Sequence, residues 1–134
     1  MGVEVFDACA LVAFIRDESG ADLVESLLND PSSECHVHAI NLLEVYYQMI
    51  RMTDEATAGR VVDDLLSLGL TVGEDLDRAF SRSVGRLKAR GKISLADCFC
   101  ISLAIRLGGR VVTSDHHEFD PLVPLGLCPI LFIR

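Results

Sequence analysis

Short apolar segments alternate with helical segments along this chain, and this alternation restricts the fold more than any other feature of the sequence. The segments that are typical of strands are residues 3–6, 34–38, 70–72, 110–114 and 129–133. Between them, the pattern predicts helices at residues 8–15, 20–28, 39–52, 54–68, 75–90 and 94–107. Because strands that alternate with helices form parallel sheets, we expect an α/β fold, a three-layer α/β/α sandwich with a central, mainly parallel sheet.

Two helix boundaries have clear signals in the sequence. Thr53 is a candidate N-cap for the helix at 54–68, and the glycines at 108 and 109 should end the helix at 94–107. We find no internal repeat, linker or low-complexity segment. The 134 residues are half hydrophobic and sufficient for one core, so we expect a single domain spanning residues 1–134.

Three features of the sequence bear on where the protein is located, and all three favour the cytoplasm. The longest stretch without a charged residue, 121–133, is too short and too rich in proline to span a bilayer. The N-terminus is acidic, whereas a signal peptide begins with basic residues. The five cysteines are odd in number and lack C-x-x-C spacing, which is typical of reduced thiols. We therefore expect a cytoplasmic protein without a membrane segment.

Four acidic residues lie where a strand ends or where a helix begins. In parallel α/β folds the working site lies at the carboxyl ends of the strands, beside helix N-termini. Residues at these junctions are brought to one edge of the sheet, so we take them as candidate site residues. They are Asp7, Glu44, Asp97 and Asp115.

Each of these acids also has a simpler explanation as part of a helix cap. The segments 94–97, 41–44 and 115–118 fit the capping-box pattern, and Asp7 fits an ordinary N-cap. Acids in such positions also complement the positive end of the helix dipole. Taken one at a time, each acid is better explained by capping than by a site.

The surroundings of Glu44 and Asp97 favour a shared site. The helix at 39–52 is apolar nearly all round, and its polar residues 41, 44, 48 and 51 form one stripe at steps of 3, 4 and 3. The helix at 94–107 is more apolar still, so both acids should be shielded from solvent. Carboxylates that converge without basic partners repel one another, and a divalent cation removes this repulsion. We expect Mg²⁺ or Mn²⁺, which both prefer oxygen ligands.

The charged residues are divided unequally between the two halves of the chain. Residues 1–77 hold 16 acidic and 3 basic side chains, and residues 78–134 hold 4 and 9, out of totals of 20 and 12. A segment without acids, 78–92, repeats arginine every four residues, so on a helix these arginines form one ridge. This ridge is either a solvated face or a surface that holds phosphate groups. Its arginines are Arg78, Arg82, Arg86 and Arg90.

The order and spacing of four motifs resemble the PIN-domain ribonucleases, and most closely the VapC-type toxins of toxin–antitoxin pairs. The motifs are VFDACALVA at 5–13, AINLLEV at 39–45, ISLADCFCISLA at 93–104 and VVTSDHHEF at 111–119. The resemblance covers essentially the whole chain. It implies a PIN-like sandwich and a metal site built from the four acids. It also implies supporting roles for Thr113 and Asn41, and a further acid at Glu118 or Asp120.

The resemblance also implies an activity. Members of this family hydrolyse RNA with Mg²⁺ or Mn²⁺, leave 5′-phosphate and 3′-hydroxyl ends, form homodimers and are silenced by an antitoxin protein. By this comparison Asp7, Asp97 and Asp115 bind the metal, and Glu44 holds water or a second ion. A metal-activated water needs no histidine base, so we do not expect His36, His38, His116 or His117 to be catalytic.

Other chemistries fit the sequence less well. An aspartyl phosphatase needs a second aspartate two residues after Asp7, where Cys9 stands. A phosphate-receiving domain needs adjacent acids after its first strand, and the P-loop motif of nucleotide-binding proteins is absent from the sequence. The alternative that remains is a PIN-fold module that binds RNA or protein without cleaving it.

Overall fold

The centre of the molecule is a five-stranded parallel sheet. The computed structural model describes residues 2–134. The strand order is β3-β2-β1-β4-β5, and each neighbouring pair is parallel. Each strand lies within one residue of its predicted bounds, so the predicted parallel sheet is confirmed. The strands are β1 (Gly2–Phe6), β2 (Ser33–His38), β3 (Thr71–Gly73), β4 (Arg110–Thr113) and β5 (Ile130–Phe132).

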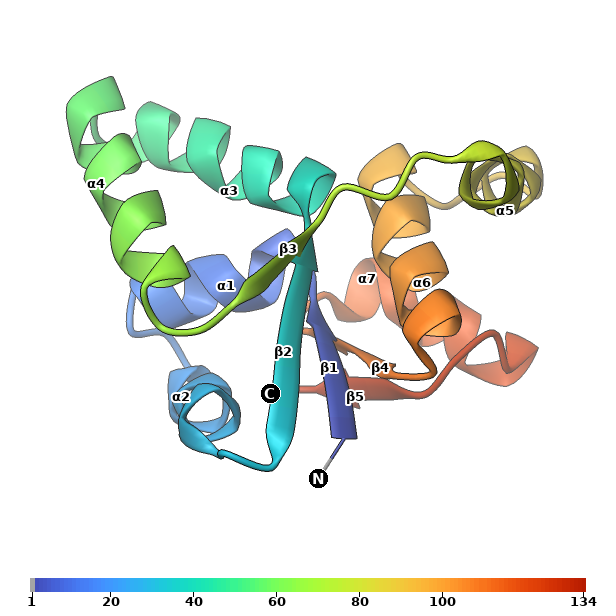
Figure 1. Cartoon of the computed structure of the whole chain (residues 1–134), viewed down its shortest axis with the longest axis horizontal. Helices are drawn as coiled ribbons and strands as arrows, with labels where there is room; N and C mark the ends of the chain where they lie inside the picture. The colour runs from blue at the N-terminus through green and yellow to red at the C-terminus, as the bar shows by residue number, and fades with distance from the viewer. Residues whose placement is uncertain (1) are drawn as a thin grey trace.

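Helices connect the strands and cover both faces of the sheet, as the three-layer prediction requires (Figure 1). The first layer contains α1 (Ala8–Ile15), α2 (Ala21–Asn29), α3 (Ala39–Met52) and α4 (Glu55–Leu66). The second contains α5 (Arg78–Ala89), α6 (Leu95–Leu107), α7 (His116–Phe119) and the 3₁₀ helix η1 (Asp120–Leu125).

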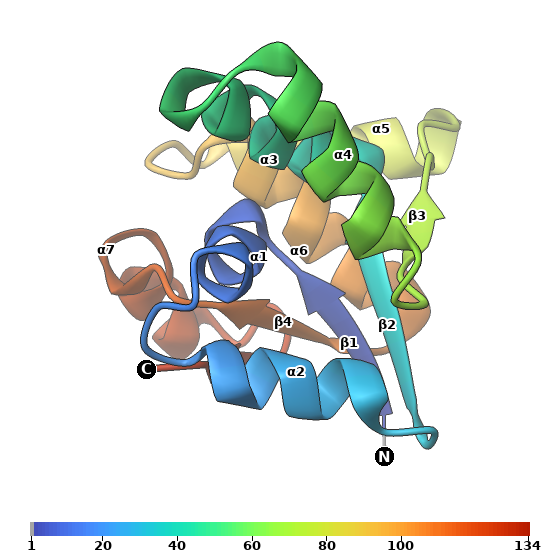
Figure 2. The same ribbon diagram turned by 90° about the vertical axis from the view of Figure 1, so that its left-hand side faces the viewer.

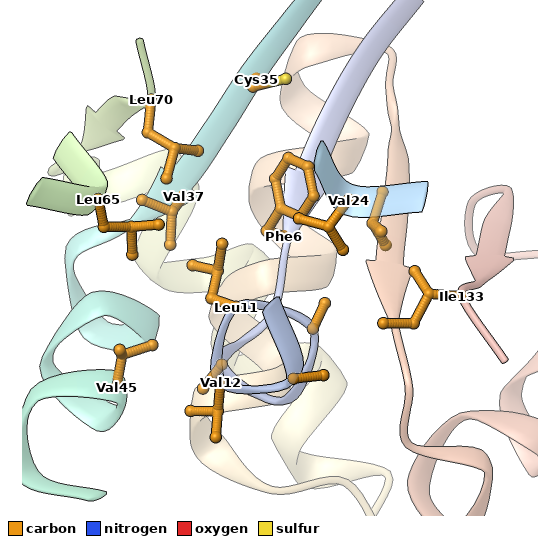
Figure 3. Packing of buried hydrophobic residues seen from close by; sticks show 14 of the residues in the cluster. Phe6, Leu11, Val12, Val24, Cys35, Val37, Val45, Leu65, Leu70 and Ile133 are labelled. Atoms are coloured by element: carbon orange, nitrogen blue, oxygen red, sulfur yellow. The ribbon is translucent and has the colours of Figure 1, made fainter. Parts of the chain in front are cut away.

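Alternate residues of the central strands point to the two helical layers. On β1, Phe6 packs with the first layer and Val5 with the second. On β4, Val112 and Val111 divide in the same way, as a two-residue side-chain period requires. Figure 3 shows the first cluster, in which Phe6 lies among side chains from α1, α2 and the neighbouring strands. The central strands β1 and β4 therefore carry apolar side chains towards both helical layers, as expected for a parallel sheet that is covered on both faces.

Two predicted boundaries were wrong, and two short helices were missed. Helix α4 is capped by Asp54, which accepts a hydrogen bond from the Thr57 amide at 2.8 Å, whereas the Thr53 hydroxyl donates to the Met49 carbonyl of α3. Helix α5 begins only at Arg78, after the Asp77 cap. The short helices α7 and η1 were missing from the prediction, because neither is long enough to show helical periodicity.

The predicted end of α6 is confirmed. Gly108 is its C-cap and has a φ of 66°, in the left-handed region that glycine adopts without strain. All five cysteines are free thiols, as expected from their number and spacing. Among the helices of residues 2–134, none combines the length and the apolar character that a bilayer span requires.

Sheet pairing sets the position of the candidate site. Strand β1 pairs with β4, with Phe6 opposite Val112, and the Asp7 amide donates to the Val112 carbonyl at 3.1 Å. The segments that follow β1 and β4 therefore leave the sheet side by side at its carboxyl edge. Asp7 leads into α1 and Asp115 leads into α7, while α3 and α6 pack against each other at the same edge.

Candidate metal-binding site at the carboxyl edge of the sheet

Thr113 links two of the predicted acids. Its buried hydroxyl donates a short hydrogen bond to Oδ2 of Asp7 and accepts one from the Asp115 amide at 2.9 Å. Residues separated by 106 positions in the chain are therefore joined through one hydroxyl group. The resemblance predicted a supporting role for Thr113, and this geometry is consistent with it.

Asp97 and Glu44 reach the site from α6 and α3. Asp97 is only 9% exposed, and its amide donates to the Ser94 hydroxyl at 3.1 Å. The side-chain amide of Asn41, which is fully buried on α3, donates to the Ala96 carbonyl at 3.0 Å. This bond fixes the first half of α3 against the turn that carries Asp97. Glu44 is partly exposed and accepts a hydrogen bond from Gln48 at 3.1 Å.

Burial and mutual repulsion raise the pKa values of three of these acids. Burial is the main cause for Asp7, whose pKa rises to about 7, with smaller contributions from Asp97 and Asp115. The pKa of Asp97 also rises to about 7, again through burial first and then through Glu118, Glu44 and Asp115. Burial and Asp115 raise the pKa of Glu44. The four predicted acids therefore lie close enough to act on one another electrostatically.

Asp7 and Asp115 cap helices and also belong to the acidic group. Oδ1 of Asp7 accepts from the Ala10 amide at 2.8 Å, and Oδ1 of Asp115 accepts from the Glu118 amide at 3.0 Å. Each carboxylate uses one oxygen to cap its helix, while Oδ2 of Asp7 accepts from Thr113 and Oδ2 of Asp115 lies near the Cys9 thiol. The capping box at 41–44 does not form, because α3 begins earlier and is capped by His38.

The side chains present suit a hard divalent cation. Within residues 2–134, none of the ion pairs involves Asp7, Glu44, Asp97 or Asp115, so no lysine or arginine neutralises them. Carboxylate oxygens are the ligands that Mg²⁺ and Mn²⁺ prefer. In the described part of the chain the acids form a loose group, since no three His, Cys, Asp or Glu side chains are close enough to make a ready-made metal cluster.

Two further residues at this edge differ in how they relate to the acids. The resemblance left open whether Glu118 or Asp120 joins the site. Glu118 is the leading charge that raises the pKa of Asp97, whereas Asp120 is bound by His116 at 2.8 Å. Glu118 is thus the acid closer to the group.

Cys9 was not predicted as a site residue, although its thiol lies 4.0 Å from Oδ2 of Asp115 and the acids help to raise its pKa to about 12.

The histidines have other partners. His38 is a buried cap, with one ring nitrogen accepting from the Ile40 amide at 3.1 Å and the other 2.9 Å from the Asp75 carbonyl. His116 lies between Asp120 and the carbonyl of Arg134 and stacks on Phe132. No hydrogen bond within residues 2–134 joins a histidine to one of the four acids.

The arginine ridge of α5 extends away from the acidic group. Arg106, near the end of α6, holds the α5 cap Asp77 at 2.6 Å, whereas Lys88, near the end of α5, donates to the Ile93 carbonyl just before α6 at 2.8 Å. The two helices therefore run in opposite directions, and the end of α5 lies beside the start of α6. Arg90 is at the end nearer Asp97, and Arg78 is at the remote end.

Comparison with known proteins identifies the family. The family model described as PIN domain matches residues 5–121, which is most of the chain. The chain belongs to the PIN domain family, as the four motifs predicted. Comparison with curated protein sequences gave no significant match.

Several solved structures with the same fold come from toxin–antitoxin systems. DNA-bound VapBC from Salmonella typhimurium is 19% identical, with a TM-score of 0.76 and full coverage of both chains. VapBC2 from Rickettsia felis, bound to promoter DNA, is 17% identical over 96% of each chain, with a TM-score of 0.73. VapC20 from Mycobacterium tuberculosis, a toxin that cleaves the sarcin–ricin loop, is 14% identical with a TM-score of 0.71, over 88% of this chain and 94% of that one. At these identities the likeness concerns the fold.

Proposed function

We propose that this protein is a metal-dependent endoribonuclease that hydrolyses RNA phosphodiesters, and that it is the toxin of a VapBC-type toxin–antitoxin pair. The observation that carries the proposal is the group of four acids at the carboxyl edge, where burial and mutual repulsion raise the pKa values of Asp7, Glu44 and Asp97 and no basic side chain compensates. Membership of the PIN domain family supports the same reaction class.

We assign the roles from the family resemblance, and the burial and position of each side chain support them. Asp7, Asp97 and Asp115 are the proposed ligands, and partly exposed Glu44 positions the attacking water or a second ion. When bound, Mg²⁺ or Mn²⁺ supplies Lewis-acid chemistry, withdrawing charge from phosphate oxygens and making water a stronger nucleophile at neutral pH. Water attacks phosphorus, the bond to the 3′ oxygen breaks, and that oxygen leaves with a proton. Thr113 keeps Asp7 and Asp115 in register through its two hydrogen bonds.

Several features support an RNA substrate and a protein partner. The ridge of α5 supplies exposed positive charge on the layer that carries Asp97, and we propose Arg78, Arg82, Arg86 and Arg90 as its attracting groups. The solved structures of similar fold include VapBC complexes, which supports a cognate antitoxin as partner. We further propose one catalytic domain over residues 1–134, a homodimer, and a cytoplasmic location.

The direct test is cleavage of end-labelled RNA by the purified protein. We expect cutting with Mn²⁺, products with 5′-phosphate ends, and loss of cutting both with EDTA and in Asp97→Asn. The matched control is Asp63→Asn, which removes an exposed carboxylate from α4 and should cut normally. Cutting that survives Asp97→Asn would place the activity elsewhere. An absence of cutting on any RNA would favour the non-catalytic binding module.

A further inference from the structure

A large cavity adjoins the acidic site on the second helical layer. Its volume is about 670 Å³, within the range of small-molecule pockets. One wall is the connection between α5 and α6, from Lys88 to Ser94, and the other is formed by α7 and η1. Figure 2 shows this connection and α7 on the same side of the molecule, although they are more than twenty positions apart in the chain.

The cavity is continuous with the acidic group. Ser94, which lines the cavity, is the N-cap of α6 and accepts the Asp97 amide hydrogen bond. Glu118 lines the opposite wall, and its charge raises the pKa of Asp97. An extended ligand strand that passes over the acids can therefore continue into the cavity along the protein surface.

The wall from the α5–α6 connection is basic. Lys88 donates a hydrogen bond to the Ile93 carbonyl. Arg90 and Lys92 are exposed, and neither makes an ion pair within residues 2–134. Lys92 has a φ of 62°, a conformation that costs energy for any residue with a side chain. The tight turn made by Gly91 and Lys92 thus keeps unpaired positive charge at the rim of the cavity.

The opposite wall is largely apolar. It is lined by buried Leu122, by exposed Pro121 and Leu125, and by His117. A concave space with positive charge on one side and an apolar wall on the other matches the two parts of a nucleotide. The phosphate can bind the cations, and the base can pack against the apolar side chains and leave water.

Building on the proposed function, we propose that this cavity is a nucleotide subsite of the nuclease. It holds a single-stranded RNA nucleotide next to the scissile phosphate, with its phosphate on Arg90 and Lys92 and its base against Pro121, Leu122 and Leu125. The end of the α5 ridge, extended by Lys92, therefore contacts the substrate directly, whereas Arg78 at the other end acts only through long-range attraction.

The first experiment measures binding without cleavage. A fluorescent single-stranded RNA of about 12 nucleotides is titrated by anisotropy into Asp97→Asn protein carrying one more substitution, with EDTA and with Mn²⁺. We expect Arg90→Gln and Lys92→Asn each to weaken binding about fivefold or more, and each to lower the slope of log affinity against log salt by about 0.7. Asparagine tolerates a positive φ, so Lys92→Asn removes the charge and keeps the turn.

Two controls separate the cavity from general charge effects. Arg60→Gln removes a positive charge from α4, on the other helical layer, and should leave binding almost unchanged. If Arg78→Gln weakens binding as much as Arg90→Gln does, RNA is held by the ridge as a whole and the cavity proposal is wrong. Unchanged affinity in both cavity variants overturns it too, and leaves the cavity to a protein segment.

The second experiment tests the base. Removing one base at a time from the RNA should identify a position whose loss weakens binding about fivefold or more, which corresponds to roughly 40 Å² of apolar surface removed from water. In Leu125→Ser this penalty should disappear, and in Val123→Ser, an equally exposed η1 residue outside the cavity, it should remain. A penalty that persists in Leu125→Ser contradicts the subsite. Because both experiments measure binding, they give an answer even if the wild-type protein does not cleave RNA.

Discussion

At the scale of single residues, Asp97 differs most from an ordinary surface acid. It lies in the first turn of a mostly apolar helix, with 9% of its surface exposed, and burial raises its pKa to about 7. An ordinary cap would be solvated and would keep a low pKa. The folded protein instead contains a carboxylate that resists ionisation. Ionising it lowers the stability of the folded state, and a nearby positive charge would offset that loss.

The first prediction concerns the pH dependence of stability without metal. Because the pKa values of Asp7 and Asp97 are higher in the folded state than in the unfolded chain, the folded state binds more protons between about pH 4 and pH 7. The free energy of unfolding should therefore fall as pH rises through this window. Each pKa unit corresponds to about 1.4 kcal/mol, so two such groups lower stability by several kcal/mol. Urea unfolding in EDTA at pH 5 and pH 8 measures the difference.

Asp97→Asn provides the matched variant for this measurement. The amide keeps the size of the side chain but never ionises, so the variant should be more stable than wild type at pH 8 and close to it at pH 4.5. Equal stability of the two proteins at pH 8 would mean that Asp97 is solvated. The same variant is expected to be inactive, so the site would gain function at the expense of stability.

The second prediction concerns Thr113, whose hydroxyl joins Asp7 and Asp115. Thr113→Val keeps the shape but leaves the Asp115 amide without its acceptor and removes a bond that lowers the pKa of Asp7. We expect a loss of about 1–3 kcal/mol in the free energy of unfolding, the cost of an unsatisfied buried donor, and weaker Mn²⁺ binding. Thr113→Ser should retain most of both, since it keeps the hydroxyl. Calorimetry of Mn²⁺ binding alongside urea unfolding distinguishes the two variants.

At the scale of secondary-structure elements, Gly20 fixes how α2 enters the structure. It is the N-cap of α2 with a φ of 96°, and a Cβ there would lie 2.7 Å from the backbone oxygen of Ile133. We predict that Gly20→Ala destabilises the protein by about 1–3 kcal/mol, because both the backbone conformation and the close contact resist a side chain. Gly59→Ala is the control: it lies within α4 with open space around it and should stabilise by about 0.5–1 kcal/mol. Thermal unfolding of both variants tests the pair.

The same scale shows what the sequence could predict and what it could not. The strands and the long helices α3 and α6 follow from local patterns, so their bounds were predicted closely. The start of α5 was placed three residues early, because Asp75 and Asp77 are committed to Arg106 across 29 and more positions, which no local pattern reveals. Helices α7 and η1 are too short for periodicity, and the cavity that they form with the α5–α6 connection depends on long-range packing. The four acids could be selected by their position after strands or near the starts of helices, but their proximity and mutual repulsion required the fold.

At the scale of the whole molecule, the unequal charge of the two chain halves becomes a difference between two helical layers. The acidic half supplies α1–α4 on one face of the sheet, and the basic half supplies α5, α6, α7 and η1 on the other (Figure 1). A polyanion is therefore attracted to the second layer and repelled by the first. The acidic group lies where the two layers meet at the carboxyl edge, so under the proposed function a divalent cation there would also reduce the repulsion of RNA that crosses it.

The last prediction follows from this link between the site and overall stability. Mn²⁺ at 100 times its dissociation constant should stabilise the wild-type protein by about 2.7 kcal/mol, if it binds only the folded state. Because the ion must displace protons from Asp7 and Asp97, whose pKa values are about 7, the stabilisation should be larger at pH 8 than at pH 6. Thermal unfolding at both pH values measures it, with Asp97→Asn as the variant that should respond weakly and Asp63→Asn as the one that should respond fully.

A shift that is equal in all three proteins would point to binding elsewhere on the acidic layer. No shift in any of them would mean that the carboxylates serve as helix caps, and the molecule would then be a PIN-fold scaffold that binds its partner without cutting it.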